Sequence, residues 1–492
     1  MKLRISIKRL SVFLAMMSAI ALLGKAQSNM VSYPVKDQFN SSDFNPAFLT
    51  AQHQYTFSIF PLAGMSVGYN DQSVINKMLK NFLSGNKTPL DTNALFNSLT
   101  KRELFYQRFE SSLLNFGYNT TYGSFSFRIK DVELLMLNLK GNFSNFLVNP
   151  SFNTLIINQP QMFPADLVHY REYSIGFAKE IIKNKLYIGL RTKLYFGKAS
   201  LVSEIQGELV RANNSFYLRT SGSVKLSAPV NIVLNDLGIL QPFVLNSSFT
   251  PANYLFNSKN VGTGFDFGIR YRFNPRIEFS ASVVDLGKIN WKDNGKELFL
   301  KGEYEFPQEY TVGSNANSLT KNPNFANAPV NYFSLFKVTY DKTVYSTPLP
   351  ANFYIGLQYL LNPKLNIGVV DRYISMKGLT QNSFSLTSNY ELSKKVNLST
   401  GYSIIGNSYF NVPFAILYKW DSGQTFFGTN NLFSFLLPSA AEFSGVTFGI
   451  CFYLFQKRTK YIEQIDYQPF YKEKKVHAVT KKGLIFNNYP KS

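Results

Sequence analysis

Regular alternation of side-chain type along residues 261–283 constrains the fold of this chain more than any other feature of its sequence. Every second residue of 261–273 is Val, Thr, Phe, Ile or Tyr, and the residues between them are Gly, Asp or Arg. The alternation resumes after the turn Asn274-Pro275-Arg276 and runs from Ile277 to Val283. A period of two over this length predicts a β-hairpin with one apolar and one polar face.

Two folds accommodate the apolar face of this hairpin. A soluble sandwich would bury it in a core, whereas a membrane barrel would present it to lipid. The composition favours the barrel, because the chain holds 46 Phe and 30 Tyr against two Trp and has a charged fraction of only 16%, where about a quarter is usual. A mean hydropathy of −0.10 agrees with a lipid-facing surface that is offset by a polar lumen.

The first 26 residues have the pattern of a secretory signal peptide. Four cations within residues 1–9 precede the apolar run 10–23, and Gly24-Lys25-Ala26 supplies the small residues of a cleavage site. The run is shorter than the roughly 18 residues that a membrane-spanning helix needs. We therefore expect an exported chain beginning at Gln27. Export argues against nucleic acid as a partner despite the net charge of +21.

Alternating patterns recur along the rest of the chain and predict an all-β fold, a transmembrane antiparallel β-barrel of about 14 strands within a range of 12–16. Pro61 and Gly64 interrupt the first span, which predicts a kinked strand there. The predicted strands are 55–69, 108–119, 122–137, 170–181, 186–199, 261–273, 277–287, 352–361, 365–373, 383–392, 396–404, 412–420, 424–430 and 443–455.

Short and long connections alternate between these strands. Outer-membrane barrels show this asymmetry, with their short turns in the periplasm. The long connection 70–107 has helical spacing at 71–83 and 91–99, which predicts short helices in a loop insert. The connection 200–260 has strand patterns of its own, and these would raise the count to sixteen if they crossed the membrane.

The mature chain divides into three parts by pattern. Residues 27–54 are irregular and are expected to form a periplasmic or plug segment, residues 55–456 form the barrel, and residues 457–492 form a basic periplasmic tail. The tail holds nine Lys or Arg and three acids together with several Tyr and Phe. Its composition suits an acidic protein partner or anionic lipid headgroups, and equally suits a disordered appendage.

Residue patterns for catalysis or metal binding are nearly absent. His53, His169 and His477 have no metal-ligand spacing, and the nucleophile and phosphate-loop motifs are missing. The single cysteine, Cys451, is expected to be a packed or lipid-side thiol. We predict no enzyme activity, cofactor or metal, although spacing alone leaves open a hydrolase carried on the barrel.

Charged residues in the inward phase of the strands are the candidate functional residues. They would form a mostly basic interior that attracts an anionic solute or binds an inward-folded plug. The alternative, which we favour, is that interior charges pair with one another for stability. The candidate lumen-facing residues are Arg128, Lys130, Arg191, Lys193, Asp266, Arg270, Arg272 and Glu278.

Three stretches of the sequence resemble a known family. They are Asn45-Pro46-Ala47-Phe48, residues 261–291 with their Asp285-Leu286-Gly287 segment, and residues 426–432. The chain resembles an uncharacterised family of Bacteroidetes outer-membrane proteins, which is similar in turn to FadL-type fatty-acid transporters and to PorV, a barrel that serves the type IX secretion system. The resemblance implies a fourteen-stranded barrel with an N-terminal segment at its lumen, and it carries over no ligand-binding residue.

Three functions follow as hypotheses. The first is a passive channel or transporter for small hydrophobic or anionic molecules in the outer membrane of a Gram-negative bacterium. The second is a non-transporting barrel that acts as a scaffold or secretion-associated partner through its loops and tail. The third is a soluble exported β-protein. The expected partners are outer-membrane lipid and, through the tail, a periplasmic or secretion-system protein.

Overall fold

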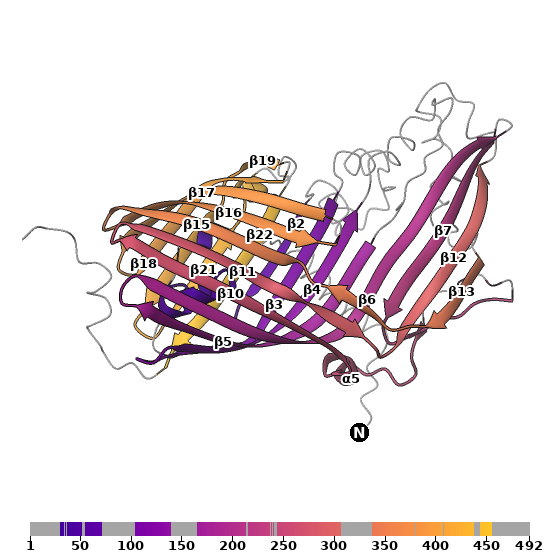
Figure 1. The fold of residues 1–492 in the computed structure, drawn as a ribbon, viewed down its shortest axis with the longest axis horizontal. Coiled ribbons are helices and arrows are strands. Elements are labelled where there is room, and N and C mark those ends of the chain that lie inside the picture. The colour runs from indigo at the N-terminus through magenta and orange to yellow at the C-terminus, as the bar shows by residue number, and fades with distance from the viewer. Residues whose placement is uncertain are drawn as a thin grey trace, which may run out of the picture. The chain divides into compact units, whose positions relative to one another are not determined.

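Fourteen antiparallel strands close into a β-barrel (Figure 1). The computed structural model describes residues 30–33, 35, 37–51, 55–70, 104–138, 165–212, 215–236, 238, 240, 244–306, 337–377, 379–406, 408–436 and 443–454. The first wall strand consists of the half-strands β1 (Tyr55–Ile59) and β2 (Met65–Asn70). The other thirteen are β3 (Leu104–Asn119), β4 (Ser124–Asn138), β5 (Ala165–Ile182), β6 (Leu186–Ala212), β10 (Asn260–Asn274), β11 (Ile277–Trp291), β15 (Ala351–Asn362), β16 (Leu365–Met376), β17 (Leu379–Ser393), β18 (Val396–Ile405), β20 (Phe414–Trp420), β21 (Gly423–Thr429) and β22 (Phe443–Tyr453).

The ring closes at the first wall strand. Both β1 and β2 pair with β3 on one side and with β22 on the other. Between the two halves, Pro61 lacks an N–H for the ladder and Gly64 has a φ of 119°, a region that favours glycine. The interruption that the sequence predicts at these two residues therefore lies within the wall.

The strand β6 continues beyond the ring. Its first part pairs with β10 as far as Gly197, and from Ser200 onward it pairs with β7 (Ser215–Ser227). Two further strands, β12 (Gly295–Phe306) and β13 (Lys337–Lys342), extend this sheet, which we call the arm. The strand β7 within the segment 200–260 thus pairs outside the ring, so the barrel has fourteen strands and not sixteen.

The predicted strands leave residues 288–351 as a long connection. The structure shows that this connection contains strands. It contributes the end of β11, the arm strands β12 and β13, and β14 (Tyr345–Pro348), which pairs with β11. Charged residues alternate with the buried Leu298 and Leu300 along β12 and conceal its strand pattern. Shorter strands are β8 (Val230–Asn231), β9 (Val244–Leu245) and β19 (Ser408–Asn411).

Helices are few and short in the part of the chain that the structure describes. They are the α-helices α5 (Pro251–Leu255) and α8 (Phe433–Leu436) and the 3-10 helices η1 (Met30–Ser32), η2 (Ser41–Asp43) and η3 (Pro46–Ala51). Among the described residues no helix combines the length and the hydrophobicity needed to cross a membrane. The helices expected at 71–83 and 91–99 lie outside the described residues.

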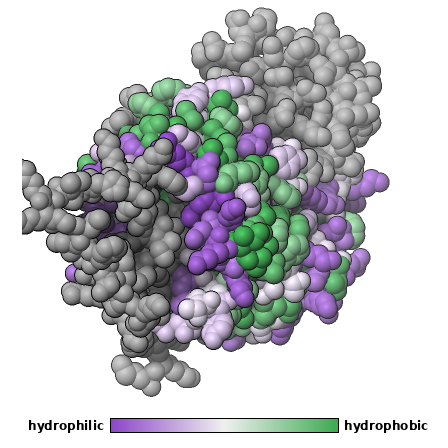
Figure 2. Space-filling model, turned by 60° about the vertical axis from the view of Figure 1, so that its left-hand side comes forward, coloured by the Kyte–Doolittle hydropathy of each residue, from purple (hydrophilic) through white to green (hydrophobic). Residues whose placement is uncertain are grey.

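The two faces of the opening hairpin separate as its alternation predicts. Phe265 is 47% exposed and Phe267 39%, whereas Asp266 is fully buried and Arg270 nearly so. Apolar side chains on many of the other strands are likewise exposed, and Figure 2 shows hydrophobic residues gathered on one outer face. An exposed apolar exterior around a buried polar interior is the pattern of a barrel embedded in lipid.

The chain divides into two compact units, residues 1–456 and residues 457–492. The first unit contains the barrel and the arm. The second lies outside the described residues, so the basic tail expected from the sequence at 457–492 stays a prediction.

A charge placed on the lipid-facing surface tests this assignment. Because Phe267 lies midway along β10 and points outward, Phe267→Arg should destabilise the barrel by about 2–4 kcal/mol in a bilayer. Denaturant unfolding in lipid vesicles measures the change. The control is Tyr122→Arg on an exposed turn, which should cost little; equal losses in both variants would contradict a lipid-facing Phe267.

Candidate functional site: the plugged lumen

The N-terminal segment 30–51, called the plug from here on, lies inside the barrel. Its described aromatic side chains are buried, including Tyr33 and Phe48 at 0% exposure. They pack against inward-facing wall residues such as Tyr354, whose ring centroid lies 5.6 Å from that of Tyr33. Burial among apolar and aromatic rings stabilises this placement of the plug.

Glycines on three wall strands make room for the plug. A Cβ at Gly189 would lie 2.3 Å from the backbone nitrogen of Ala47, and one at Gly268 would lie 2.0 Å from Oδ1 of Asn45. A Cβ at Gly356 would lie 2.6 Å from the ring of Tyr33. Any side chain at these positions would occupy the volume of the plug, so the wall is shaped to receive it.

Asn45 attaches the plug to the opening hairpin. Its side-chain amide donates hydrogen bonds to the carbonyl oxygens of Ile269 on β10, at 3.1 Å, and Ala281 on β11, at 3.2 Å. Its own Oδ1 accepts from the backbone N–H of Ala47 at 2.9 Å and so shapes the start of η3. The Asn-Pro-Ala stretch noted in the sequence is therefore a bridge between the plug and the wall.

Asp43 is the electrostatic anchor of the plug. Its carboxylate contacts the guanidinium of Arg128, lies 2.8 Å from Nζ of Lys130 and lies 3.3 Å from Nη1 of Arg191. The hydroxyl of the neighbouring Ser42 accepts from both arginines, at 2.5 Å and 2.9 Å. Burial raises the pKa of the Asp43 carboxyl, but the three cations outweigh burial and hold this pKa well below its ordinary value.

Asp43 belongs to a larger network, which we call the charged belt. Lys193 lies 2.9 Å from Asp266 and 2.5 Å from Asp285, and Arg108 lies 3.1 Å from Asp285. The belt joins five cations to five carboxylates by ion pairs: Arg108, Arg128, Lys130, Arg191 and Lys193 with Asp43, Glu110, Glu172, Asp266 and Asp285.

The belt is therefore neutral and not mostly basic. Of the candidate residues taken from the sequence, Arg128, Lys130, Arg191, Lys193 and Asp266 are brought together in it. The interpretation that interior charges pair with one another describes the belt better than an open cationic lumen does. The sequence reasoning missed the carboxylates Asp43, Glu110, Glu172 and Asp285. Asp43 lies outside the strands and Asp285 at a break in the alternation, while the other two stand in the predicted strands 108–119 and 170–181, from which no candidate was taken.

The break in alternation after Val283 is a β-bulge. The ladder between β10 and β11 shifts register at Asp266, and Asp285 has a φ of 64°. Oδ1 of Asp266 accepts the backbone N–H of Asp285 at 2.7 Å, so it satisfies a donor that the bulge leaves without a ladder partner. A left-handed residue is costly unless its surroundings fix it, and here two ion pairs fix its side chain.

The remaining three candidates lie closer to the short turns. Arg270 donates to the hydroxyl of Thr50 in the plug at 3.2 Å and stacks over the ring of Tyr187 at 3.8 Å. Arg272 pairs with Glu278 at 3.5 Å across the hairpin. Arg270 thus touches the plug, while Arg272 and Glu278 pair with each other.

An apolar section of the lumen adjoins the belt on the side of the long loops. The ring of Tyr170 lies 5.3 Å from that of Tyr195, and the indole N–H of Trp291 donates to Thr347 at 3.0 Å. The side chains of the section are buried against one another: Tyr106, Val132, Leu134, Met136, Val168, Tyr170, Tyr195, Ile289, Trp291, Leu349, Ile374 and Met376.

Cys451 and His169 are the described cysteine and histidine of the chain. Cys451 is buried against Val35, Phe39 and Phe426, so of the two places expected for this thiol it has the packed one, beneath the plug. His169 lies 2.6 Å from the hydroxyl of Tyr254, and the other two histidines lie outside the described residues. No group of metal-ligating side chains occurs among the described residues.

Fold and site together define a transmembrane β-barrel whose lumen is closed by its own N-terminal segment. The chain belongs to the family described as "Family of unknown function (DUF5723)", whose model matches residues 46–430. No curated protein matches the chain.

Several solved structures resemble this one. The toluene transporter TodX of Pseudomonas putida is 10% identical, with a TM-score of 0.38 over 84% of this chain and 93% of its own. A FadL homologue of Pseudomonas aeruginosa is 10% identical, with a TM-score of 0.38 over 87% and 98%. The toluene transporter TbuX of Ralstonia pickettii is 11% identical, with a TM-score of 0.37 over 85% and 93%.

A bulkier residue at Gly268 should expel the plug. Gly268→Val places carbon atoms where Asn45 now lies, and overpacking of this kind costs about 1–3 kcal/mol, or roughly tenfold in plug release. Release uncovers Cys451, so the rate at which a thiol reagent labels Cys451 should rise about tenfold. The outward-facing neighbour Phe267→Val serves as the matched control and should label at the natural rate. Unchanged labelling of Gly268→Val would show that the plug does not rest on this glycine.

Removal of the Asp43 charge should weaken the plug in a pH-dependent way. Asp43→Asn leaves buried cations without their partner, which costs about 3 kcal/mol at pH 7. Because the pKa of this carboxyl is lowered in the folded chain, its stabilisation is complete above the ordinary pKa of about 4 and is lost gradually as the pH falls from there toward the lowered pKa.

Cys451 labelling by a pyridyl disulfide, which reacts with thiols in acid, measures this effect from pH 7 to pH 3. The natural chain should label much more slowly than Asp43→Asn at pH 7, and the difference between the two rates should begin to shrink below about pH 4. Thr50→Ala, which removes a neutral contact of the plug, is the control and should keep a constant ratio to the natural chain. A constant ratio for Asp43→Asn would contradict the electrostatic anchor.

Proposed function

We propose that this protein is a passive outer-membrane channel for small hydrophobic molecules, and that the plug holds the described state closed. The observation that carries the proposal is the apolar section of the lumen. A barrel that only needed to be filled could use paired polar residues throughout, as it does in the belt. Twelve buried apolar side chains facing one another instead offer a molecule poor in polar groups an environment that it prefers to water.

The order of residues along the strands supports the same function. Proceeding from the short turns toward the long loops, Lys130 is followed by Val132 on β4, and Lys193 is followed by Tyr195 on β6. On β16 the inward-facing Arg372 is followed by Ile374. The apolar section therefore lies between the long loops and the belt, so a molecule entering from the loop side would meet apolar side chains first and charges second.

Charge balance favours hydrophobic over anionic cargo. The cations of the belt are matched by its carboxylates, so the belt itself offers no surplus positive charge to an anion. Passage requires the plug to leave, since its aromatic side chains and η3 occupy the volume between the wall glycines. Removing the plug takes Asp43 with it, and the belt cations then face the opened passage.

Orientation and location complete the proposal. The exported chain would lie in the outer membrane of a Gram-negative bacterium, with its short turns in the periplasm and its long loops and arm outside. The tail 457–492 would then extend into the periplasm, where a basic, aromatic-rich segment suits an acidic protein partner. Chemistry on a substrate is not part of the proposal, because the lumen charges pair with one another rather than form an acid–base or nucleophile arrangement.

The second candidate function is a non-transporting scaffold. The close anchoring of the plug favours it, because Asp43, Asn45 and Tyr33 are each bonded to the wall or stacked on it. In that case the barrel would present its arm, loops and tail to partners and would never open. The two functions differ in whether the lumen conducts once the plug is removed.

Uptake by cells distinguishes these functions. In a host that lacks its own hydrophobic-uptake channel, expression of the natural chain should raise the uptake of a labelled monoaromatic hydrocarbon. Leu134→Asp puts a carboxylate into the apolar section and should reduce that uptake about tenfold, because a desolvated charge there opposes the passage of an apolar molecule.

Two further strains serve as controls. Tyr122→Ser on an exposed turn should leave uptake unchanged, and deletion of residues 30–51 should raise it above the natural level. Heat-modifiable gel mobility verifies that each barrel is folded. If neither the natural chain nor the plug deletion raises uptake, the channel is excluded and the scaffold function is favoured.

A further inference from the structure

Cations gather on four neighbouring short turns at one end of the barrel. The turn between β5 and β6 holds Lys183 and Lys185, and the turn between β10 and β11 holds Arg276. The pairings of β6 with β10, β11 with β15 and β16 with β17 place the four turns next to one another around the ring. The six exposed cations of this arc, called the basic rim, are Lys183, Lys185, Arg276, Lys364, Lys394 and Lys395.

The rim covers only part of the circumference. The two other short turns, between β3 and β4 and between β20 and β21, have no cation at their tips. The first presents Tyr122, 81% exposed, and the second presents Asp421. These two turns flank the strands β1, β2 and β22 that close the ring. Positive charge is therefore concentrated on the side of the barrel away from the closure.

The rim cations have no carboxylate partner among the described residues. None of the six forms an ion pair with another residue that the structure describes, although nearby Arg272 pairs with Glu278 at 3.5 Å. The carboxylate of Glu180, the acid nearest to Lys183 in sequence, accepts the backbone N–H of Asn184 instead. Six unpaired cations on rigid hairpin turns are available to an external anion.

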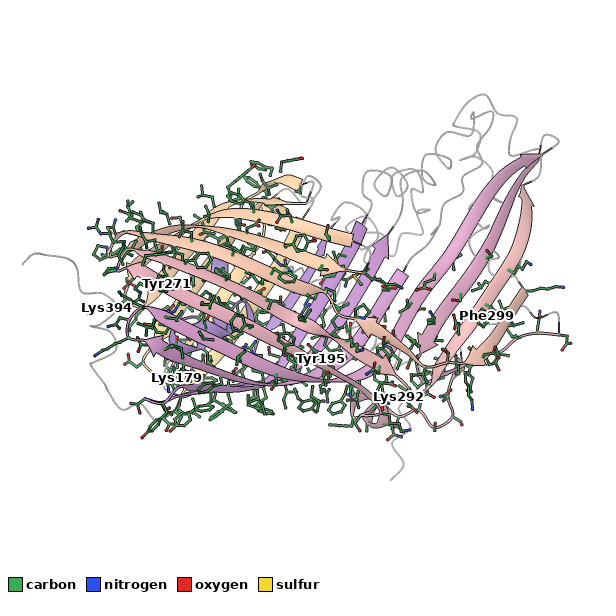
Figure 3. The ribbon with its side chains drawn as sticks, viewed as in Figure 1. Lys179, Tyr195, Tyr271, Lys292, Phe299 and Lys394 are labelled. Atoms are coloured by element: carbon green, nitrogen blue, oxygen red, sulfur yellow. The ribbon has the colours of Figure 1, made fainter. Side chains whose placement is uncertain are left out.

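The lipid-facing apolar surface of the barrel ends next to these cations. Ile182 is 48% exposed, Phe273 57%, Leu361 51% and Leu392 54%. Each stands one to three residues from a rim cation in sequence. In Figure 3, Lys179, Tyr271 and Lys394 lie at this end of the barrel and Lys292 lies toward the other. The cations are thus at the edge of the apolar surface, at the level where lipid headgroups lie.

We propose that the basic rim binds the phosphates of anionic phospholipids, of the phosphatidylglycerol type, in the leaflet that meets the short turns. Their acyl chains lie along the adjacent apolar residues while their phosphates contact the lysines. The tail of the same chain is a poor occupant, because its nine cations outnumber its three acids. An acidic protein approaching from the aqueous side would use the cations but not the apolar residues beside them.

Lipid titration in a neutral detergent tests the proposal on the full chain. Phosphatidylglycerol or phosphatidylcholine is added, and two quantities are measured: the temperature at which the heat-modifiable gel shift is lost, and the lipids retained in native mass spectrometry. Phosphatidylglycerol should stabilise the natural chain and remain bound, whereas phosphatidylcholine should do neither. Replacement of all six rim cations by Gln should weaken phosphatidylglycerol binding at least about tenfold.

A matched variant controls for overall charge. It replaces six cations near the long loops and on the arm by Gln: Lys259, Lys288, Lys292, Lys301, Lys337 and Lys342. This variant should keep phosphatidylglycerol binding, and both variants should retain the natural stability in phosphatidylcholine. Equal loss in the two variants, or equal binding of the two lipids, would overturn the proposal.

Two further experiments distinguish the proposed lipid from other partners. Lipid A that bound the rim more tightly than phosphatidylglycerol would place the rim in the other leaflet and overturn the assignment. A folded six-Gln variant that kept its lipid but lost a periplasmic protein would also overturn it. The inference rests on the proposed membrane placement, and carbonate extraction of the natural chain without detergent would defeat both. Absence of hydrocarbon uptake would defeat only the proposed channel.

Discussion

Buried charges that line a lumen need partners of the opposite charge. Here Asp43 of the plug provides such a partner by contacting three cations of the wall. The wall residues of the charged belt contribute five cations but only four carboxylates, and the plug supplies the fifth. A buried cation without a partner is strongly destabilising, whereas a fully paired network is tolerated. The position of the plug in the barrel is therefore fixed by the need to neutralise the wall as well as by the shape of the plug.

The other features of the lumen follow from this arrangement. Glycines at 189, 268 and 356 let the plug approach the wall backbone closely enough for Asp43 and Asn45 to reach their partners. On the loop side of the belt, the wall residues that the structure describes become apolar and pack without counter-charges. The plug, the charged belt and the apolar section thus follow one another along the barrel axis. The belt depends on the plug for a carboxylate, and the apolar section begins where the belt ends.

Much of the wall could be predicted from sequence, because the alternation of side chains along a membrane strand is a local pattern. It can be recognised without knowing which strands lie beside it. Residues 261–273 are an example, with Phe265 outward and Asp266 inward. The arm was predicted only in part: strand patterns were visible within 200–260, where β7 lies, but β12 is recognised only by its pairing with β7 and β13. The strand count therefore followed from alternation, while the extent of β6 did not.

The candidate site was predictable only in part. Arg128 and Arg191 were identified because they alternate with apolar residues along their strands. When the apolar residues face lipid, the charged residues between them face the lumen. Their partner Asp43 lies in an irregular segment with no period, so nothing local marks it as part of the lumen. Asp285 was hidden for a different reason, since the bulge reverses its phase and the alternation alone would assign it to lipid. Contacts between distant segments are set by the closed ring, which no local pattern encodes.

The closure of the ring between β22 and the half-strands β1 and β2 also constrains how the protein is assembled. Among the described elements, the strand that completes the wall is the last, and the segment enclosed by the wall precedes the first strand. The plug must therefore either be surrounded as the wall curls toward closure or be threaded through one end of a finished ring. The first route lets the cations of the wall meet Asp43 as they come together. In that route the strands assemble around the plug, and the size of the plug sets the diameter of the barrel.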